Sequence, residues 1–200
     1  ENLGTGKTTL SGSLTFSSAT VTQGTLQIGN NTNLPAISSP IDNFASLILN
    51  ISNDYGIFAP ISGDGSVTYR GSGLHVMVVA STYTGGTTID GTTLQIDQRG
   101  TSGSIVGNVS LVNNGTLSFI RSDSFSFPGS ITGNGVLAVF TPASASFTGN
   151  INTTSNFQVF DGGTVNFETP ATLGTVEVYD ENTTVHLASG GINTLTTGGI

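Results

Sequence analysis

The feature that most constrains this chain is a short pattern that returns about every 20 residues. Four segments of alternating apolar and polar residues begin at positions 117, 137, 157 and 176. These segments are Leu117-Ser118-Phe119-Ile120, Leu137-Ala138-Val139-Phe140, Phe157-Gln158-Val159-Phe160 and Val176-Glu177-Val178-Tyr179. A fixed period of this length is typical of repeat architectures, in which each unit packs only against its neighbours.

Other segments follow the same period. A second series is Phe125-Ser126-Phe127, Ala145-Ser146-Phe147, Val165-Asn166-Phe167 and Val185-His186-Leu187. A third, weaker series begins at Ile131 and Ile151 and drifts to Ile192. The first half shows the period at Leu26-Gln27-Ile28, Leu47-Ile48-Leu49 and Val67-Thr68-Tyr69.

Alternation with a period of two predicts half-buried strands, and the Gly, Asn, Asp and Ser residues between the segments predict turns. A unit of about 20 residues is too short to bury its own apolar face, so copies must stack. The sequence therefore predicts an all-β parallel β-helix, a solenoid with about 20 residues per coil. Its 200 residues would form roughly ten coils, a rod on the order of 50 Å long.

Two other folds have similar spacings. A β-sandwich has strands every 8–12 residues, but nothing makes those strands repeat in sequence. A leucine-rich repeat has a similar period, but its Leu-x-x-Leu-x-Leu signature is missing here. We therefore favour a single solenoid over residues 1–200, as a segment of a longer chain.

Charge and composition exclude several classes of protein. The chain has 4 Lys+Arg and 12 Asp+Glu, a net charge of −8, so it lacks the basic surface that nucleic-acid binding requires. It has no Cys, which excludes disulfides and thiol chemistry, and no apolar run long enough for a membrane-spanning helix.

One stretch resembles a known family. The residues are Tyr83-Thr84-Gly85-Gly86-Thr87-Thr88-Ile89-Asp90-Gly91-Thr92-Thr93-Leu94-Gln95-Ile96, and the pattern continues through Asn113-Asn114-Gly115-Thr116-Leu117 to Gly133-Asn134-Gly135. It is similar to the passenger-associated repeat of bacterial autotransporters, most closely over residues 81–140, with a weaker copy near 10–30 that ends in Gly24-Thr25-Leu26-Gln27-Ile28-Gly29. Thr92 departs from the family, which usually has Gly there.

The resemblance implies a right-handed parallel β-helix on the bacterial cell surface or outside the cell. It implies an outer-membrane translocator or flanking repeats as partners, and no catalytic residues. Since the chain has no Cys and no pair of histidines, we also expect no metal-ligating and no cofactor-binding residues. The residues themselves suggest two further partners. One is a second copy of the chain, stacked end to end, and the other is a surface glycan. We expect a non-catalytic structural or adhesive rod; a carbohydrate-active β-helix enzyme and a calcium- or glycan-binding module are the alternatives.

The segment Gly4-Thr5-Gly6-Lys7-Thr8-Thr9 imitates the end of a phosphate-binding loop. The full motif needs a glycine where Glu1 stands, and a helix after the loop. Residues 10–16 instead read as a strand, so we expect a turn of a degenerate repeat and no nucleotide site.

Asp161 and Asp180 follow equivalent aromatic residues on neighbouring coils, which would place them about 5 Å apart. Such a pair could cleave a sugar or share a calcium ion. Turn formation explains both residues more simply, and no Arg or Lys lies near them in sequence.

The two histidines, His75 and His186, each lie between apolar residues, so we expect both to face solvent. Five Asn-x-Ser/Thr triplets could carry glycans in a eukaryotic secreted protein. They begin at Asn50, Asn108, Asn114, Asn152 and Asn182. If the family resemblance holds, we expect them to be unmodified.

Overall fold

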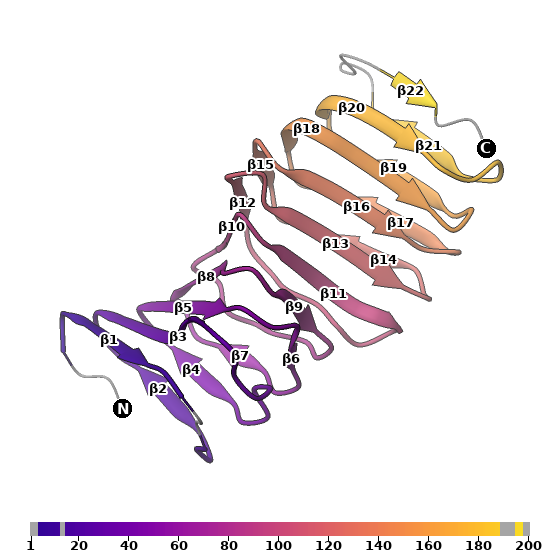
Figure 1. The fold of residues 1–200 in the computed structure, drawn as a ribbon. Helices are drawn as coiled ribbons and strands as arrows, with labels where there is room; N and C mark the ends of the chain where they lie inside the picture. The colour runs from indigo at the N-terminus through magenta and orange to yellow at the C-terminus, as the bar shows by residue number, and fades with distance from the viewer. Residues whose placement is uncertain (1–3, 13–14, 189–194, 198–200) are drawn as a thin grey trace.

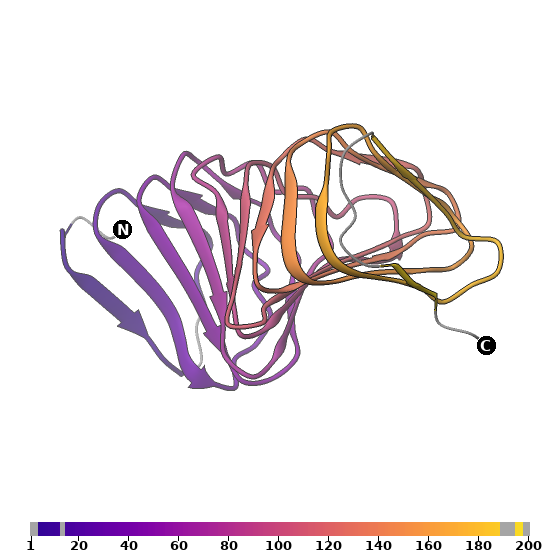
Figure 2. The ribbon, with the colours of Figure 1, turned by 90° about the horizontal axis from the view of Figure 1, so that it is seen from above.

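The computed structural model describes residues 4–12, 15–188 and 195–197 and shows a β-solenoid (Figure 1). The described residues contain strands and no helix, and the strands stack in parallel in about nine turns of roughly 20 residues. Successive coils wind around a common interior (Figure 2). The all-β parallel solenoid is therefore confirmed, with about nine coils where the sequence predicted roughly ten.

Two series of strands belong to one 15-stranded sheet. The first, called column A, is β1 (Lys7–Leu10), β3 (Thr25–Thr32), β5 (Ser46–Ile51), β8 (Ser66–Arg70), β10 (Thr87–Asp90), β12 (Val109–Val112), β15 (Ile131–Gly133) and the start of β18 (Ile151–Phe160). The second, called column B, is β6 (Tyr55–Ile57), β9 (Leu74–Met77), β11 (Thr93–Gly100), β13 (Thr116–Arg121), β16 (Val136–Phe140) and the end of β18. The ten-residue β18 joins the columns, and β20 (Thr172–Val178) and β22 (Leu195–Thr197) extend the stack beyond it.

Two smaller sheets complete the coils. In the N-terminal half these strands are β2 (Ala19–Val21), β4 (Ile41–Asn43) and β7 (Ile61–Ser62). In the C-terminal half they are β14 (Phe125–Phe127), β17 (Ser144–Phe147), β19 (Thr164–Phe167) and β21 (Thr184–Leu187). Each coil thus contributes three strands at most, and every backbone ladder runs from one coil to the next.

The predicted 20-residue register is confirmed in both main series. Leu117 pairs with Leu137, Leu137 with Phe157, and Phe157 with Val176, and all four side chains are buried. In the second series the ladder runs from β14 to β21 without a register shift. Ile131 also pairs with Ile151, whereas Ile192 lies outside the described residues.

A ladder of three phenylalanines fills the C-terminal core. The ring centroids of Phe127 and Phe147 lie 6.4 Å apart, and those of Phe147 and Phe167 lie 5.5 Å apart. Phe147 is fully buried and also meets the ring of Phe119 from column B, at 5.8 Å. Because these rings come from two sides of the solenoid, they hold the sides together.

The periodic segments of the first half join a different column from the one their pattern suggests. Leu26, Leu47 and Val67 stack in register, as their spacing predicts. Their ladder then continues through β10 and β12 to Ile131, not to Leu117. Sequence spacing alone could not separate the two columns, because both repeat with the same period.

The corner between columns A and B varies from coil to coil. One coil turns through Asn113 and Asn114, both with positive φ, whereas β18 runs through without a turn. Gly133 occupies this corner in the coil between them, with φ of 122°. A Cβ atom there would overlap the carbonyl oxygen of Leu111, so only glycine fits.

We expect Phe147→Ala to reduce the free energy of unfolding by about 3–5 kcal/mol, because it empties the centre of the phenylalanine ladder. Equilibrium denaturant unfolding measures this change. The matched control is Phe44→Ala, because the side chain of Phe44 is 52% exposed and its loss should cost less than about 1 kcal/mol. Equal losses in the two variants would contradict the ladder.

Candidate functional site

The most elaborate polar structure is a loop that leaves column B after Ile96. Asp97 and Arg99 both adopt positive φ, at 68° and 62°, and the ladder to β13 shifts register between Ile96 and Gly100. Gln95 secures this bulge, since its Nε2 donates to the carbonyl oxygen of Asp97 at 2.7 Å. The backbone therefore bulges from the ladder at this coil.

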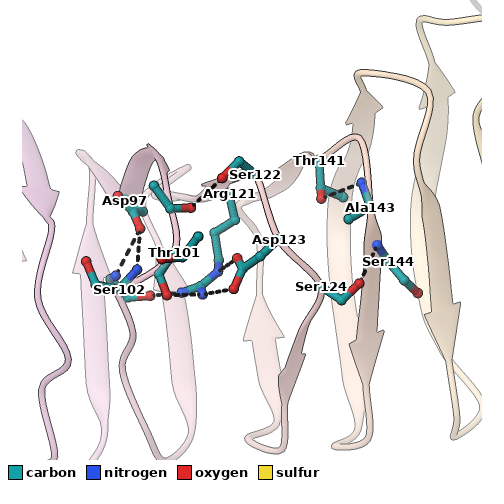
Figure 3. Close-up of polar contacts among 12 residues, drawn as sticks. Asp97, Thr101, Ser102, Arg121, Ser122, Asp123, Ser124, Thr141, Ala143 and Ser144 are labelled. Atoms are coloured by element: carbon teal, nitrogen blue, oxygen red, sulfur yellow. Dashed lines mark hydrogen bonds and ion pairs between the residues drawn. The ribbon is translucent and has the colours of Figure 1, made fainter.

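The carboxylate of Asp97 closes the loop on itself (Figure 3). Asp97 is 4% exposed, and it accepts backbone N–H bonds from Gln98 at 2.7 Å, Ser102 at 2.9 Å and Gly103 at 3.0 Å. Burial by itself raises the pKa of this carboxyl group. The three N–H donors, together with the positive charge of Arg121, outweigh burial and hold the pKa of Asp97 below its ordinary value.

Arg121 on β13 clamps the far end of the loop (Figure 3). Its guanidinium donates to the carbonyl oxygens of Gly103 and Thr101. It also donates to both carboxylate oxygens of Asp123, and each of these two bonds is 2.9 Å long. It also lies 5.6 Å from the ring centroid of Phe125. Because Arg121 is 8% exposed and its charge is paired, it stabilises the loop as a structural group.

The loop extends Arg99 along the outside of the solenoid. The guanidinium of Arg99 binds the carboxylate of Asp161, with Nη1 to Oδ2 at 2.7 Å and Nη2 to Oδ1 at 3.4 Å. The two residues are 62 positions apart in sequence. Arg99 thus bridges from β11 to the turn after β18, past the coils of β13 and β16.

The predicted pair Asp161 and Asp180 does come together. The backbone N–H of Asp161 donates to a carboxylate oxygen of Asp180 at 2.5 Å, across neighbouring coils. No Arg or Lys lies near the pair in sequence, but in the folded chain Arg99 reaches Asp161. No sequence signal reveals this contact, since it depends on where the Asp97 loop leaves the ladder.

Glu177, three residues before Asp180, is not suited to donate a proton to a sugar. Glu177, on the neighbouring strand, accepts hydrogen bonds from Gln158 and from the Tyr179 hydroxyl, each at 2.8 Å. These bonds lower the pKa of Glu177, whereas a general acid for sugar cleavage needs a raised one. In this cluster Asp161 pairs with the charge of Arg99, and Asp180 and Glu177 accept hydrogen bonds.

His75 corrects the expectation of two exposed histidines. It pairs with Tyr55 and Leu94 in column B, so its ring points into the core and is fully buried. Its Nε2 donates to the carbonyl oxygen of Arg70 at 3.0 Å, which leaves Nδ1 without a hydrogen bond. Burial lowers the pKa of His75 to about 4, against the opposing effect of the bond to Arg70.

The sequence pattern misplaced His75 because both of its neighbours are apolar. Alternation then suggests that Leu74 and Val76 face the core, but the register places His75 and Met77 there. His186 is exposed between half-buried neighbours, as predicted.

The remaining candidates lie on strands and turns. Lys7–Leu10 form β1, so the imitation phosphate loop runs into a strand. The strand expected over residues 10–16 is wrong, because β1 ends at Leu10 and residues 11–12 and 15–16 lie outside any strand. Among the five asparagines of the Asn-x-Ser/Thr triplets, Asn50 is half-buried and the other four are exposed. Their modification state stays a prediction.

The described part of the chain lacks two further kinds of feature. Within residues 4–12, 15–188 and 195–197, no three acidic or histidine side chains gather closely enough to hold a metal ion. The same residues contain no helix with the length and apolar character needed to cross a membrane.

Comparison with known proteins gives one informative match. The chain is 31% identical over 154 residues to a protein described as "Adhesin BmaC autotransporter" from Brucella suis biovar 1 (strain 1330). The match covers 66% of this chain and 4% of that adhesin.

The chain fits the passenger-associated β-helix repeat family. No family model matches the chain, and no solved structure matches it. This passenger-like repeat spans about one twenty-fifth of the adhesin that it resembles.

We expect the stability of this passenger-like repeat to fall by about 3 kcal/mol as the pH decreases from about 6.5 to about 4, through His75 alone. In that range the unfolded chain binds a proton at His75 and the folded chain does not, so protonation favours unfolding. Denaturant unfolding at several pH values measures the slope. His75→Leu should remove this part of the slope, and the exposed control His186→Gln should retain it; equal slopes in both variants would refute the assignment.

Removing Arg121 and removing Arg99 should have different costs. Arg121→Ala leaves two carbonyl groups and a carboxylate without their hydrogen-bond donor. We therefore expect the free energy of unfolding to fall by about 2–3 kcal/mol, with faster amide exchange over residues 97–103. Arg99→Ala breaks a pair whose arginine side chain is 62% exposed, so the loss should be below about 1 kcal/mol. Hydrogen exchange and denaturant unfolding test both, and unchanged exchange in Arg121→Ala would show that the clamp is not needed.

Proposed function

We propose that this chain is a non-catalytic, adhesive segment of a rod that a bacterium displays outside the cell. The observation that carries the proposal is the similarity to an autotransporter adhesin across a chain that folds as a β-solenoid. The printed name of that relative describes it as an adhesin and an autotransporter. We extend the same role, location and translocator partner to this chain.

We also propose that the chain is one stretch of a longer solenoid. A cavity of about 300 Å³ in the N-terminal coils supports this, and both apolar and polar side chains line it. Its lining includes Phe16, Ile28, Leu34, Ile37 and Tyr55. A further coil, whether from flanking repeats or from a second copy end to end, would cover this surface as each internal coil covers the next.

The acid pair supports a second candidate, carbohydrate cleavage. The observation in its favour is that Arg99 lies beside Asp161 and Asp180, which gives the pair a cation. Against it, Asp161 is bound to Arg99 and Asp180 accepts a backbone N–H, so both carboxylates are already engaged. The adhesive role accounts for the same contacts as cross-links between coils.

Display of the chain on a bacterium tests the proposal. The chain is fused to an autotransporter translocator in a non-adherent strain, and attached cells are counted on surfaces coated with host matrix proteins or glycans. We expect several-fold more attachment than with the translocator alone, because the rod presents long rows of hydrogen-bonding side chains. The matched control is Phe147→Ala at equal surface level, which should attach less because its core is disrupted.

Two outcomes would overturn the adhesive role. One is attachment no greater than that of the translocator alone on every surface. The other is release of sugar from a polysaccharide by the wild-type chain, lost in Asp161→Asn or Asp180→Asn, which would favour the enzyme.

A further inference from the structure

Phe58 places an exposed aromatic ring on the outside of column B, directly after β6. The residue is 55% exposed. The coils on both sides of it are described, since its N–H donates to the carbonyl oxygen of Ile37 and the N–H of Val78 donates to that of Ile57. A Cβ atom at Gly56 would come within 2.5 Å of two carbon atoms of the ring, so the ring lies directly over this glycine. The glycine therefore gives the ring its place, and the neighbouring coils leave it open to solvent.

A single exposed aromatic residue needs no explanation, but this one borders a hollow of about 170 Å³. Besides Phe58, the hollow is lined by Val76 and Val78 from the next coil. Val76 pairs with Gly56 in the β6–β9 ladder and is buried, so the apolar part of the lining is continuous with the sheet. The hollow thus offers an apolar surface beside an exposed ring.

Two exposed polar side chains line the same hollow. One is Asp54, which precedes β6, and one of its carboxylate oxygens accepts the N–H of Leu74 at 3.3 Å. The other is Gln98, which the bulge at Asp97 carries out of the β11 ladder. In the described part of the chain, the second carboxylate oxygen of Asp54 and the side-chain amide of Gln98 have no hydrogen-bond partner. Both groups are therefore available to a ligand.

This lining suits a small ligand that has an apolar face and hydroxyl groups around its edge. A hexose ring has C–H groups on its flatter face, and they are attracted to the negative face of an aromatic ring. Its hydroxyl groups can donate to a carboxylate, and can both donate to and accept from an amide. A globular protein partner suits the hollow less well, since stable protein interfaces bury about 800 Å² on each side.

We propose that Asp54, Phe58 and Gln98 form a binding site for one sugar ring of a neutral surface glycan. The sugar packs against Phe58 and Val76, and its hydroxyl groups bind Asp54 and Gln98. Acidic sugars are repelled by the Asp54 carboxylate and by the net charge of −8. This inference rests on the adhesive role proposed above, for which it names a site and a ligand class.

Titration of the ¹⁵N-labelled chain with defined sugars tests the proposal through the shifts of its backbone amide signals. The neutral probes are maltotetraose, cellotetraose and mannotriose, and the acidic control is tetragalacturonate. We expect at least one neutral probe to bind at millimolar concentration, with the largest shifts at residues 54–58, 76–78 and 98. Tetragalacturonate should produce no shifts there.

Two variants test the ring, and a third is their control. Phe58→Ala removes the ring and should weaken binding of that neutral probe at least about fivefold. Gly56→Ala keeps every side chain that lines the hollow but displaces the ring, so it should weaken binding to a similar extent. The control is Phe44→Ala, which removes a ring of similar exposure, 52%, and should change binding less than about twofold.

Two further variants test the polar groups. Asp54→Ala and Gln98→Ala should each weaken binding about threefold, because each removes a hydrogen-bond partner of the sugar. Asp64→Ala removes an exposed carboxylate that does not line the hollow, and it should bind like the wild type. Circular dichroism and thermal melting confirm that each variant folds.

Several results would overturn the sugar site. They are no binding of any neutral probe, equal binding of tetragalacturonate, a Phe44→Ala effect as large as that of Phe58→Ala, and shifts at residues 54–58 that appear when the chain is concentrated without sugar. The last result would show that a second copy of the chain covers the ring. Failure of cell attachment with intact sugar binding would instead refute only the adhesive role, and attachment by a chain that binds no sugar would refute only this site.

Discussion

The parallel pairing of each coil with the next is the interaction on which the rest of this structure depends. A coil of about 20 residues has neither a core nor a complete set of hydrogen bonds by itself. Its N–H and C=O groups find partners in the coils above and below, and its inward side chains extend columns such as Phe127, Phe147 and Phe167. Hydrogen bonds and apolar burial therefore require the same register, and a side chain that departs from it disturbs both.

This arrangement leaves the outer surface free to vary. Side chains that point outward do not pack in the core, so they can form the cross-coil contacts of Arg99 and Glu177 and the stacked rings of Phe160 and Tyr179. Because the chain has only 4 Lys+Arg, each cation accounts for a large share of its positive charge. All three arginines form an ion pair with an aspartate within the chain.

Local sequence and place in the fold can separate in such a repeat. The copies that begin at Thr25 and Thr93 share the segment Thr-Leu-Gln-Ile, and in both the glutamine donates to a carbonyl oxygen two residues later, at 2.7 Å. Both strands then shift register through residues with positive φ. Yet β3 lies in column A and β11 in column B. The shared segment therefore specifies a bulge at the end of a strand. The position of that strand within its coil determines whether the bulge lies in column A or column B.

The sequence by itself determined the period, the alternation and hence the solenoid with its stacked Leu, Val and Phe columns, because apolar spacing at 20 residues admits only stacking. The tertiary structure alone decided which column each segment joins, that His75 points inward, and that Arg99 meets Asp161 from 62 residues away. The physical reason is that a period fixes separation along the chain, whereas a side chain's direction depends on its strand partners. For His75, those partners are Tyr55 and Leu94, one coil to either side.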